Sequence, residues 1–547
     1  MAYDFAHGSG TKSDPYLIAT EADFWGIFDV SSGGQENFVG KHFHQTADIE
    51  ITQSIDPQTL ICCVYDGENH TISGLKKGAS YLGSSIWKNS IFSNCTNENP
   101  SDYIPALFKW TWQEDDGEGN LGPKSELHYI RLLNSPGIYI FAGEDTIATN
   151  LTVKNSGGFV GSTLEDCEIS ECYGENLSHT QEYYATGALC DVFNCKFENM
   201  VVVNVEYKGT KWSAGGMVGE VYYSNFKNCV VLGAMITAGT SAGGFAGAVY
   251  GGTFEDCYAL GVKVTLEPYG PYDNKSGGFV GEAYTRRYFG DPKYIPFVFR
   301  RCIAHGDVTC DAPYGSGGFV GHTWPDVGAI FDQCGAEVSV DNLSKSSGGF
   351  VGEAWGPPEP VIVCKDCYAI GNSILSNPEE AESNGGFCGI AEDVLFEKCF
   401  SNGAVSGGVN VGGFCGEDAG YYSDGEEHWS IQCIDCYYDS ETSGQSDTGK
   451  GTPKTTAEMK TQSTFFGWNF VNTWKLGAFA GGNRKSITNE DGEYSVPVKD
   501  GTVEVFLELD PSGGYPFLQF ETKKSIAKSG RIRCDWYVRG AMPEELT

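Results

Sequence analysis

The sequence predicts an all-β chain, a right-handed parallel β-helix with short helical caps at both ends. Three observations support this prediction. A Gly-Gly-aromatic word recurs along the chain, short Val-, Ile-, Phe- and Tyr-rich segments separate its copies, and most of the 20 cysteines fall once per repeat. A basic period near 28 residues, from Gly215 to Gly243 for example, grows only by insertion. Such a period is typical of stacked coils, and parallel crossovers are right-handed.

The elements are expected in four regions. Residues 1–75 form an N-terminal module and cap, in which the capping-box pattern from Thr20 to Asp23 opens a short helix. Residues 76–150 depart from the repeat and hold a polar loop at 111–126, so we expect an inserted region. Residues 151–440 are the repeat helix. Residues 441–547 form a C-terminal cap and attachment segment, with a second capping box from Thr455 to Glu458.

The repeated word has eight clear copies. They are SGGFVG at 156–161, AGGMVG at 214–219, AGGFAG at 242–247, SGGFVG at 276–281, 316–321 and 347–352, NGGFCG at 384–389, and VGGFCG at 411–416. We expect the glycines to let the chain turn tightly where coils stack, and the phenylalanine to fill the interior. The structural positions assigned on this basis are Gly157, Gly158, Phe159, Gly277, Gly278, Phe279, Gly317, Gly318, Phe319, Gly348, Gly349 and Phe350. Strand rather than helix follows each word, which argues against a phosphate-binding loop.

A cysteine closes the frame apolar-x-x-Cys in most coils, as in Phe254/Cys257 and Phe299/Cys302. We expect a buried column of small apolar side chains. Coils about 4.8 Å apart also lie within disulfide range, so some bridging stays open. CKDC at 364–367 and CIDC at 433–436 fit the same frame, and no matching second half of a zinc site accompanies them. No metal or cofactor is predicted.

GGFVG words at this spacing resemble the GLUG-type repeats of bacterial and phage surface proteins. The stretches GSGTKSDPYLIATEADF (8–24) and YDGENHTISGL (65–75) resemble the module that precedes such repeats. CYYDSETSGQ (436–445) and GGYPFLQF (513–520) resemble the module that follows them. The resemblance implies a β-helix and a surface or adhesin-like role, and it brings no shared catalytic residue.

The charge balance limits the partners. The 72 Asp and Glu residues against 36 Lys and Arg give a net charge of −36. Such a chain repels phosphate backbones and anionic membranes, so no nucleic acid is expected as a partner. No apolar run is long enough for a membrane-spanning helix, so no membrane insertion is expected. The first residues lack a basic and apolar secretion signal, which fits a protein released by lysis.

Two rows of residues follow the words and are the candidate ligand-binding positions. In five consecutive repeats, an aromatic residue stands three positions after the last glycine of the word. In several repeats, a glutamate stands one position after that glycine. The candidates are Tyr222, Tyr250, Tyr284, Trp324, Trp355, Glu282 and Glu353. If the strand continues without a corner, alternation places Glu282 and Tyr284 opposite Phe279, and both rows are exposed. If a turn intervenes, the rows are interior. Two interpretations stay open, a sugar-binding groove and an aromatic ladder that steadies the stack or contacts another chain.

Catalysis has weaker support. Glu282 with Glu353, or Asp291 with Asp326, could supply the carboxylate pair of a glycoside hydrolase, but spacing singles out neither, and no catalytic residue is assigned. His322 replaces a glutamate and is expected to be a surface variant. His42 and His44 are expected on the solvent side of the first strand, with metal binding as the alternative. Long loops at 284–297, 323–330, 354–361 and 418–430 fit a recognition surface.

These observations favour a non-enzymatic structural or receptor-binding protein, foremost a phage fibre or spike component at the virion surface. Its expected partners are other virion or surface proteins, a host surface glycan or protein, and further copies of itself, with a trimer as one option. One alternative is a secreted bacterial adhesin at the cell surface. Another is a polysaccharide depolymerase on the same scaffold.

Overall fold

A computed structural model describes most of the chain. The described residues are 5, 7–28, 38–53, 60–76, 79–83, 85–96, 106–112, 124–182, 185–270, 274–285, 296–310, 315–343, 345–356, 362–376, 382–420, 431–476, 498–499, 502–509, 514–528 and 532–538. They fall into two compact units. Unit 1 comprises Met1–Thr180 and Gly187–Val202, and unit 2 comprises Gln181–Thr186 and Val203–Thr547.

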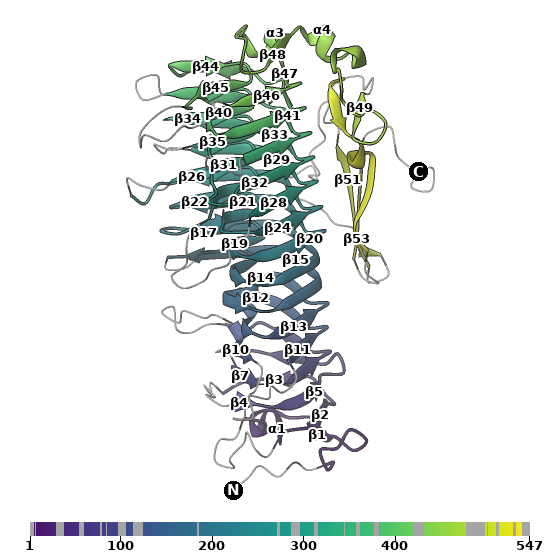
Figure 1. The fold of residues 1–547 in the computed structure, drawn as a ribbon. Helices are drawn as coiled ribbons and strands as arrows, with labels where there is room; N and C mark the ends of the chain where they lie inside the picture. Colours follow the sequence, from purple (N-terminus) through teal and green to yellow (C-terminus); the bar gives the residue numbers. More distant parts are fainter. Residues whose placement is uncertain are drawn as a thin grey trace. The chain divides into compact units, whose positions relative to one another are not determined.

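Unit 1 is a stack of parallel strands that pair in columns (Figure 1). One column runs through β1 (Tyr16–Ile18), β2 (Lys41–Gln45), β5 (Cys63–Asp66), β8 (Ile86–Lys88), β11 (Ser125–His128), β13 (Thr146–Thr149) and β15 (Glu168–Gln181). A second runs through β3 (Ile49–Glu50), β6 (Thr71–Ser73), β9 (Ile91–Ser93), β12 (Arg131–Glu144), β14 (Thr152–Glu165) and β16 (Leu189–Phe193). A third joins β4 (Leu60–Ile61), β7 (Ala79–Gly83) and β10 (Ala106–Trp112) to β12. β17 (Lys196–Gly209) continues from unit 1 into unit 2.

The first helix of unit 1, α1 (Glu21–Gly26), begins with the predicted capping box. The Thr20 hydroxyl accepts from the backbone N–H of Asp23, and the Asp23 carboxylate accepts from the backbone N–H of Thr20. Phe24 on this helix is fully buried. The strands between residues 79 and 149 are rungs of the same stack as their neighbours. Residues 113–123 of the predicted polar loop lie outside the described residues. The proposed region boundaries stay predictions.

Unit 2 repeats one coil of four strands, here named columns A to D. Column A follows each word and contains β19 (Val218–Tyr222), β23 (Ala246–Val249), β27 (Val280–Tyr284), β31 (Val320–Trp324), β35 (Val351–Trp355), β40 (Cys388–Glu392) and β45 (Cys415–Asp418). Column B contains β20 (Ser224–Lys227), β24 (Gly252–Glu255), β28 (Phe297–Arg300), β32 (Ala329–Asp332), β36 (Ile362–Lys365), β41 (Val394–Glu397) and β46 (Gln432–Ile434). Every neighbouring pair within a column that the structure describes is parallel.

The other two columns complete the coil. Column C contains β21 (Val230–Ala238), β25 (Tyr258–Leu266), β29 (Ile303–Cys310), β33 (Gly335–Asn342), β37 (Tyr368–Ala369), β38 (Ser373–Leu375), β42 (Phe400–Ser401), β43 (Val405–Ser406), β47 (Tyr437–Asp439) and β48 (Thr452–Lys454). Column D precedes each word and contains β18 (Ala214–Gly215), β22 (Ser241–Gly243), β26 (Lys275–Gly277), β30 (Ser316–Gly317), β34 (Ser346–Gly348), β39 (Ser383–Gly385) and β44 (Asn410–Gly412). Strands that pair in register from coil to coil define a parallel β-helix, so the predicted fold class is confirmed. Its handedness stays a prediction.

The word forms the corner between columns D and A, and its glycines are required for space. A Cβ on Gly277 would lie 2.1 Å from the Val280 carbonyl oxygen, and one on Gly278 would lie 2.2 Å from that of Gly318. Neither glycine has the left-handed backbone that favours this residue. The sequence interpretation of a tight turn therefore needs a correction. The backbones of neighbouring strands approach so closely at this corner that no side chain fits.

The phenylalanines of the words form a continuous ladder inside unit 2. Phe245, Phe279, Phe319, Phe350, Phe387 and Phe414 stack with ring centroids 4.8–4.9 Å apart and planes within 10° of parallel. A second ladder from column B meets it edge-on at 5.6–6.3 Å. Phe159 of unit 1 is also fully buried. Cys364 and Cys433 replace the phenylalanine of column B in two coils. Together the two ladders supply much of the apolar core.

The cysteines lie at the next corner, between columns B and C. The residue before each has a left-handed backbone, with φ between 51° and 57° at Asn228, Asp256, Arg301, Gln333, Asp366, Lys398 and Asp435. The following thiols are buried and free. Most donate to a carbonyl of the preceding coil, as Cys302 Sγ does to Phe254 O at 3.4 Å. The cysteines thus fill a column of narrow interior positions.

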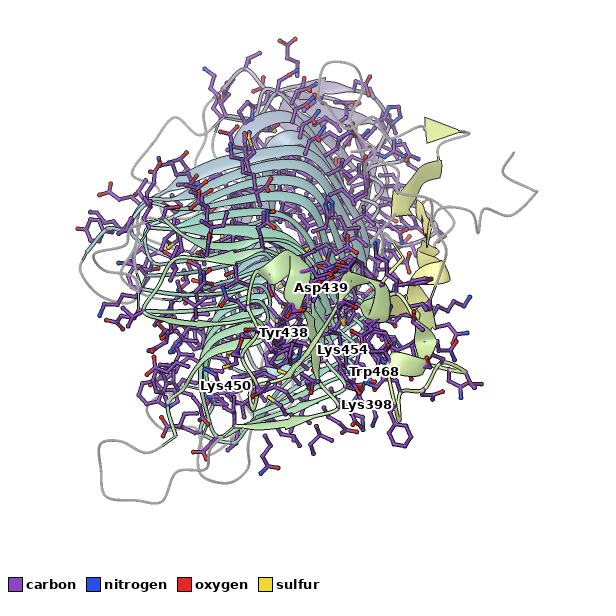
Figure 2. The ribbon with its side chains drawn as sticks, turned by 90° about the horizontal axis from the view of Figure 1, so that it is seen from above. Lys398, Tyr438, Asp439, Lys450, Lys454 and Trp468 are labelled. Atoms are coloured by element: carbon purple, nitrogen blue, oxygen red, sulfur yellow. The ribbon has the colours of Figure 1, made fainter. Side chains whose placement is uncertain are left out.

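The C-terminal end of unit 2 carries two short helices, α3 (Ser440–Ser443) and α4 (Thr456–Met459), and a 3-10 turn, η2 (Gln462–Thr464). The capping box of Thr455 and Glu458 at α4 is present as predicted. Figure 2 looks onto this end and labels Tyr438, Asp439 and Trp468 there. Trp468 Nε1 donates to Asp435 O at 3.0 Å, and Tyr515 donates to Asp439 Oδ2 at 2.6 Å. These contacts fasten the segment after the last coil to the stack.

The remaining strands form two small sheets. β49 (Trp474–Leu476) pairs antiparallel with β52 (Pro516–Leu518), which the 3-10 turn η3 (Gln519–Thr522) follows. β50 (Val498–Lys499), β51 (Thr502–Leu509), β53 (Lys523–Lys528) and β54 (Ile532–Val538) form the other sheet. Among the helices in the described ranges, none has the length and apolar character needed to cross a bilayer.

Candidate functional site

The glutamates after the words stand in one register column of unit 2. Backbone pairing aligns Glu220, Ala248, Glu282, His322, Glu353, Ile390 and Glu417 in successive coils. Side chains at equivalent positions of paired parallel strands point to the same face. The column therefore gathers three acidic groups and one imidazole over the coils from Glu220 to Glu353.

Column D places a polar side chain beside most of these glutamates. Ser213 Oγ donates to Glu220 Oε1 at 2.9 Å, and Lys275 Nζ lies 2.8 Å from Glu282 Oε1. Each donor precedes its glutamate by seven residues, because the Gly-Gly-Phe corner folds column D against column A. The sequence interpretation missed this contact. Its pattern is visible two residues before the first glycine of the words, where Ser213, Ser241, Lys275, Ser346, Ser383 and Asn410 stand.

The space over this column is a groove of about 510 Å³. Its lining combines aromatic rings with carboxylates and hydroxyls. The lining residues are Trp212, Ser213, Glu220, Thr240, Ser241, Tyr250, Lys275, Glu282, Tyr284, His322, Trp324, Glu353 and Trp355. Ligand sites are typically concave and combine apolar or aromatic walls with a few polar groups. We refer to these residues as the acidic groove.

Six of the seven predicted ligand-binding residues line the acidic groove. The seventh, Tyr222, is buried instead. It stacks on Tyr250 with centroids 4.6 Å apart and donates to Glu220 Oε2 at 2.7 Å. The ladder interpretation holds for this pair. It does not extend onward as a parallel stack, since Tyr284 and Trp324 meet at 6.1 Å and 72°.

The expected exposure of both rows is wrong for most members. Trp324 is 53% exposed, but Glu353 is only 8% exposed. The Glu282 side chain is 13% exposed. The reason is the neighbouring column D, whose side chains cover the glutamates and form hydrogen bonds with them. Polar groups therefore form the floor of the groove, and Trp324 together with Trp212 (48% exposed) stands at its open side.

His322 is a correction to the sequence interpretation, which placed it on the surface. It is 5% exposed and lies in register between Glu282 and Glu353. Its Nδ1 lies 3.7 Å from Glu282 Oε1 and, among the described residues, has no hydrogen-bond partner. Burial and the nearby Lys275 ammonium hold the pKa of His322 well below its usual value, so the ring is neutral.

The two flanking glutamates differ in their surroundings. Glu282 accepts hydrogen bonds from Lys275 Nζ at 2.8 Å and from Ser241 Oγ at 3.2 Å. Burial raises the pKa of Glu353 above its usual value, and this effect exceeds the opposing hydrogen bonds from Trp355 and Ser346. The Trp355 Nε1 to Glu353 Oε2 distance is 3.5 Å. One floor thus holds a carboxylate paired with an ammonium and a carboxyl group that retains its proton to higher pH.

The other predicted acids do not join this site. Asp326 is exposed and does not line the groove. Asp291 lies outside the described residues, as do most of the loop 284–297 and parts of the loops at 354–361 and 418–430. Of the predicted pairs, only Glu282 and Glu353 have both members in the groove lining, where Glu220 joins them.

A second cluster lies in unit 1, where His44, Asp66 and Glu68 offer ligand atoms within 4.8 Å of one another. His42 and His44 lie on the outer side of β2, as predicted, and alternate with the buried Phe43 and Gln45. Lys88 Nζ already lies 2.6 Å from Asp66 Oδ2 and neutralises the buried acid. The cluster is therefore satisfied as an ion-pair group around Asp66.

Comparison with known proteins agrees with this architecture. Residues 238–265 match the GLUG motif, and the matched segment spans one coil from the end of β21 through β25. The chain is therefore a parallel β-helix that contains a GLUG motif. A Gly-rich membrane protein of Evansella cellulosilytica is 40% identical over 116 residues, which are 20% of this chain and 12% of the relative. The chain thus covers a small part of that relative's length.

Two solved structures are similar at low identity. A Bacteroides ovatus protein described as an immunoglobulin A1 protease is 16% identical with a TM-score of 0.22, covering 86% of this chain and 93% of its own. The catalytic domain of a GH87 alpha-1,3-glucanase is 10% identical with a TM-score of 0.20, covering 72% and 63%. At these TM-scores neither likeness bears on the chemistry of this chain.

Proposed function

We propose that the chain is a receptor-binding surface protein that binds glycan in the acidic groove. The observation that supports this proposal is the half-exposed Trp324 ring beside buried carboxylates and an imidazole with an unused nitrogen. Aromatic rings pack on the apolar faces of sugars, and fixed carboxylates accept sugar hydroxyls. Aromatic walls with a few placed polar groups are typical of small-ligand sites.

The charge of the groove favours a neutral glycan or one with amino sugars. Glu220, Glu282 and Glu353 face a single ammonium, Lys275, and the whole chain carries −36. A uronic-acid polymer would bring further negative charge against these groups. A neutral polymer brings hydroxyl donors, which carboxylates and the neutral His322 nitrogen accept.

The proposal is tested by binding of the full chain to arrayed neutral, amino and acidic polysaccharides. We expect retention on a neutral or amino polymer, and at least a tenfold loss of affinity in Trp324→Ala. Phe466 is 81% exposed and lies outside the groove, so Phe466→Ala is the matched control and should bind as wild type. Absence of binding to every polymer, or equal loss in both variants, would contradict the proposal.

We place the protein in a phage fibre or spike, with a bacterial cell surface as the second candidate. The GLUG repeats support a surface role in either setting, and the 40% identity to a bacterial membrane protein over 116 residues supports the second. The gene neighbourhood separates them. Adjacent tail or capsid genes are expected for the fibre, and their absence would favour the bacterial surface.

A further inference from the structure

The acidic groove contains the parts of a hydrolytic centre. We propose that it cleaves the glycan it binds by inverting hydrolysis, with Glu353 as general acid and Glu282 as general base. This inference rests on the proposed glycan binding and adds an activity to it.

The register fixes the spacing. Glu282 and Glu353 pair with His322 from its two sides and are therefore two coils apart. Two strand spacings place their Cα atoms about 9.5 Å apart. Inverting glycosidases keep their two carboxyl groups about 6.5–9.5 Å apart, which leaves room for a water beside the sugar, whereas retaining enzymes keep them about 5–5.5 Å apart.

The contacts assign the roles. The Lys275 ammonium at 2.8 Å and the Ser241 hydroxyl at 3.2 Å hold the Glu282 carboxylate in place, which suits the group that takes a proton from water. Glu353 lies on the buried floor beside Trp355, without an ammonium at contact distance among the described residues. The raised pKa of Glu353 supports the acid role. Two carboxyl groups with opposed environments are the arrangement used for acid and base.

His322 provides the independent observation. His322 is part of the groove lining, and its buried Nδ1 lacks a hydrogen-bond partner in the described part of the chain. Buried polar atoms in folded proteins are ordinarily paired, so an unpaired one at a groove floor indicates a missing ligand. Its position between the two glutamates suits a water or a sugar hydroxyl held between acid and base.

The reaction balances as follows. Glu282 takes a proton from water, and the water oxygen bonds to the anomeric carbon. The bond between that carbon and the glycosidic oxygen breaks, and Glu353 gives its proton to the departing oxygen. One water is consumed and two sugar hydroxyl ends form. Glu282 then releases its proton to solvent, and Glu353 takes up a proton from solvent.

The substitutions that test this inference are Glu353→Gln and Glu282→Gln, assayed by release of reducing ends from each polysaccharide that the wild-type chain binds. We expect either to lower the rate at least 100-fold, within the roughly 10²–10⁴ range of general acid-base groups. Glu417 stands in the same register column but outside the groove, so Glu417→Gln should cleave as wild type. The first product seen by proton NMR should have the inverted anomeric configuration.

The outcomes separate the two proposals. Binding without any released product overturns the hydrolysis and leaves the binding intact, as does equal cleavage by wild type and Glu353→Gln. A retained anomer overturns the inverting assignment. If no polysaccharide binds, both proposals fall. Glu282→Gln removes the ion pair between Glu282 and Lys275 and can disturb the fold, so Glu353→Gln, which keeps that ion pair, decides the case.

Discussion

Single residues in the acidic groove show how the same type of side chain acquires different properties. Glu282 and Glu353 occupy equivalent positions of the repeat, yet only the first faces an ammonium from column D. The difference comes from Lys275, which stands where most coils have a small polar residue. One substitution in the repeat therefore gives the two carboxyl groups different surroundings. This difference should be measurable in the stability of the fold.

The first prediction concerns the pH dependence of unfolding. Burial raises the pKa of Glu353 above 4.5, with smaller effects from Lys275 and Glu382. The folded state thus holds this proton more tightly than the unfolded state. Its contribution is fully present below the unfolded pKa and is lost as pH rises through the folded pKa. Urea denaturation should show Glu353→Gln gaining stability relative to wild type between pH 4 and pH 8.

The neighbouring His322 works in the opposite direction. Its pKa is lowered, so the folded state resists protonation and loses stability as pH falls below about 6.5. Because both proteins in the comparison retain His322, the difference between wild type and Glu353→Gln isolates the glutamate. An unchanged difference across this pH range would mean that folding does not raise the pKa of Glu353.

A second prediction separates core from groove aromatics. Phe319 is fully buried between Phe279 and Phe350, whereas Trp324 is 53% exposed. Phe319→Ala should lower the free energy of unfolding by about 3–5 kcal/mol. Trp324→Ala should cost less than about 1 kcal/mol and act on binding. Similar losses of stability in both variants would contradict this division.

At the scale of elements, the corner between columns D and A determines the geometry of the site. Its close approach folds a polar residue against the glutamate seven positions later, and so builds the groove floor. The sequence revealed the repeat and the alternation of column A, which placed Glu282, Tyr284 and Trp324 on one face. It did not reveal that column D covers them, because that contact depends on backbone packing between two sheets and not on any local period.

The same limit explains the error at His322. In the sequence, this residue is a single histidine in a row of glutamates, which suggested a surface variant. The structure places it between Glu282 and Glu353 of the neighbouring strands, where it is buried. The caps were predictable, because a capping box is a local pattern. The left-handed residue before each cysteine was not identified, since Asn, Asp, Arg, Gln and Lys all occupy that corner.

The third prediction tests the corner directly. A Cβ on Gly318 would lie 2.0 Å from the carbonyl oxygen of Gly349, a backbone atom that cannot move without separating two coils. Gly318→Ala should therefore cost about 1–3 kcal/mol or more in thermal or urea unfolding. Gly270 meets nothing within 4 Å and serves as the control. Equal stability of Gly318→Ala and Gly270→Ala would show that the corner has spare room.

At the scale of the whole molecule, the net charge of −36 should act as a filter on ligands. Repulsion between like charges is strong at low ionic strength and is screened by salt, since the Debye length falls from about 30 Å at 0.01 M to 3 Å at 1 M. The chain carries this charge in addition to the acidic floor of the groove. Acidic and neutral polysaccharides should therefore respond differently to salt.

The fourth prediction follows from this filter. Any affinity for a uronic-acid polymer should be weak at 0.01 M salt and rise with added salt, while affinity for a neutral polymer changes little. Isothermal titration at two salt concentrations measures both. Tight binding of an acidic polymer that weakens with salt would instead point to a basic surface outside the groove.

The central claim is that function lies just past each word, in the acidic groove, and not in the glycines. A crystal structure of the full chain with a bound oligosaccharide tests it most directly. We predict a sugar ring against Trp324 and a sugar hydroxyl or water within hydrogen-bond distance of His322 Nδ1. An oligosaccharide seated elsewhere, or a groove filled by a second copy of the chain, would contradict the claim.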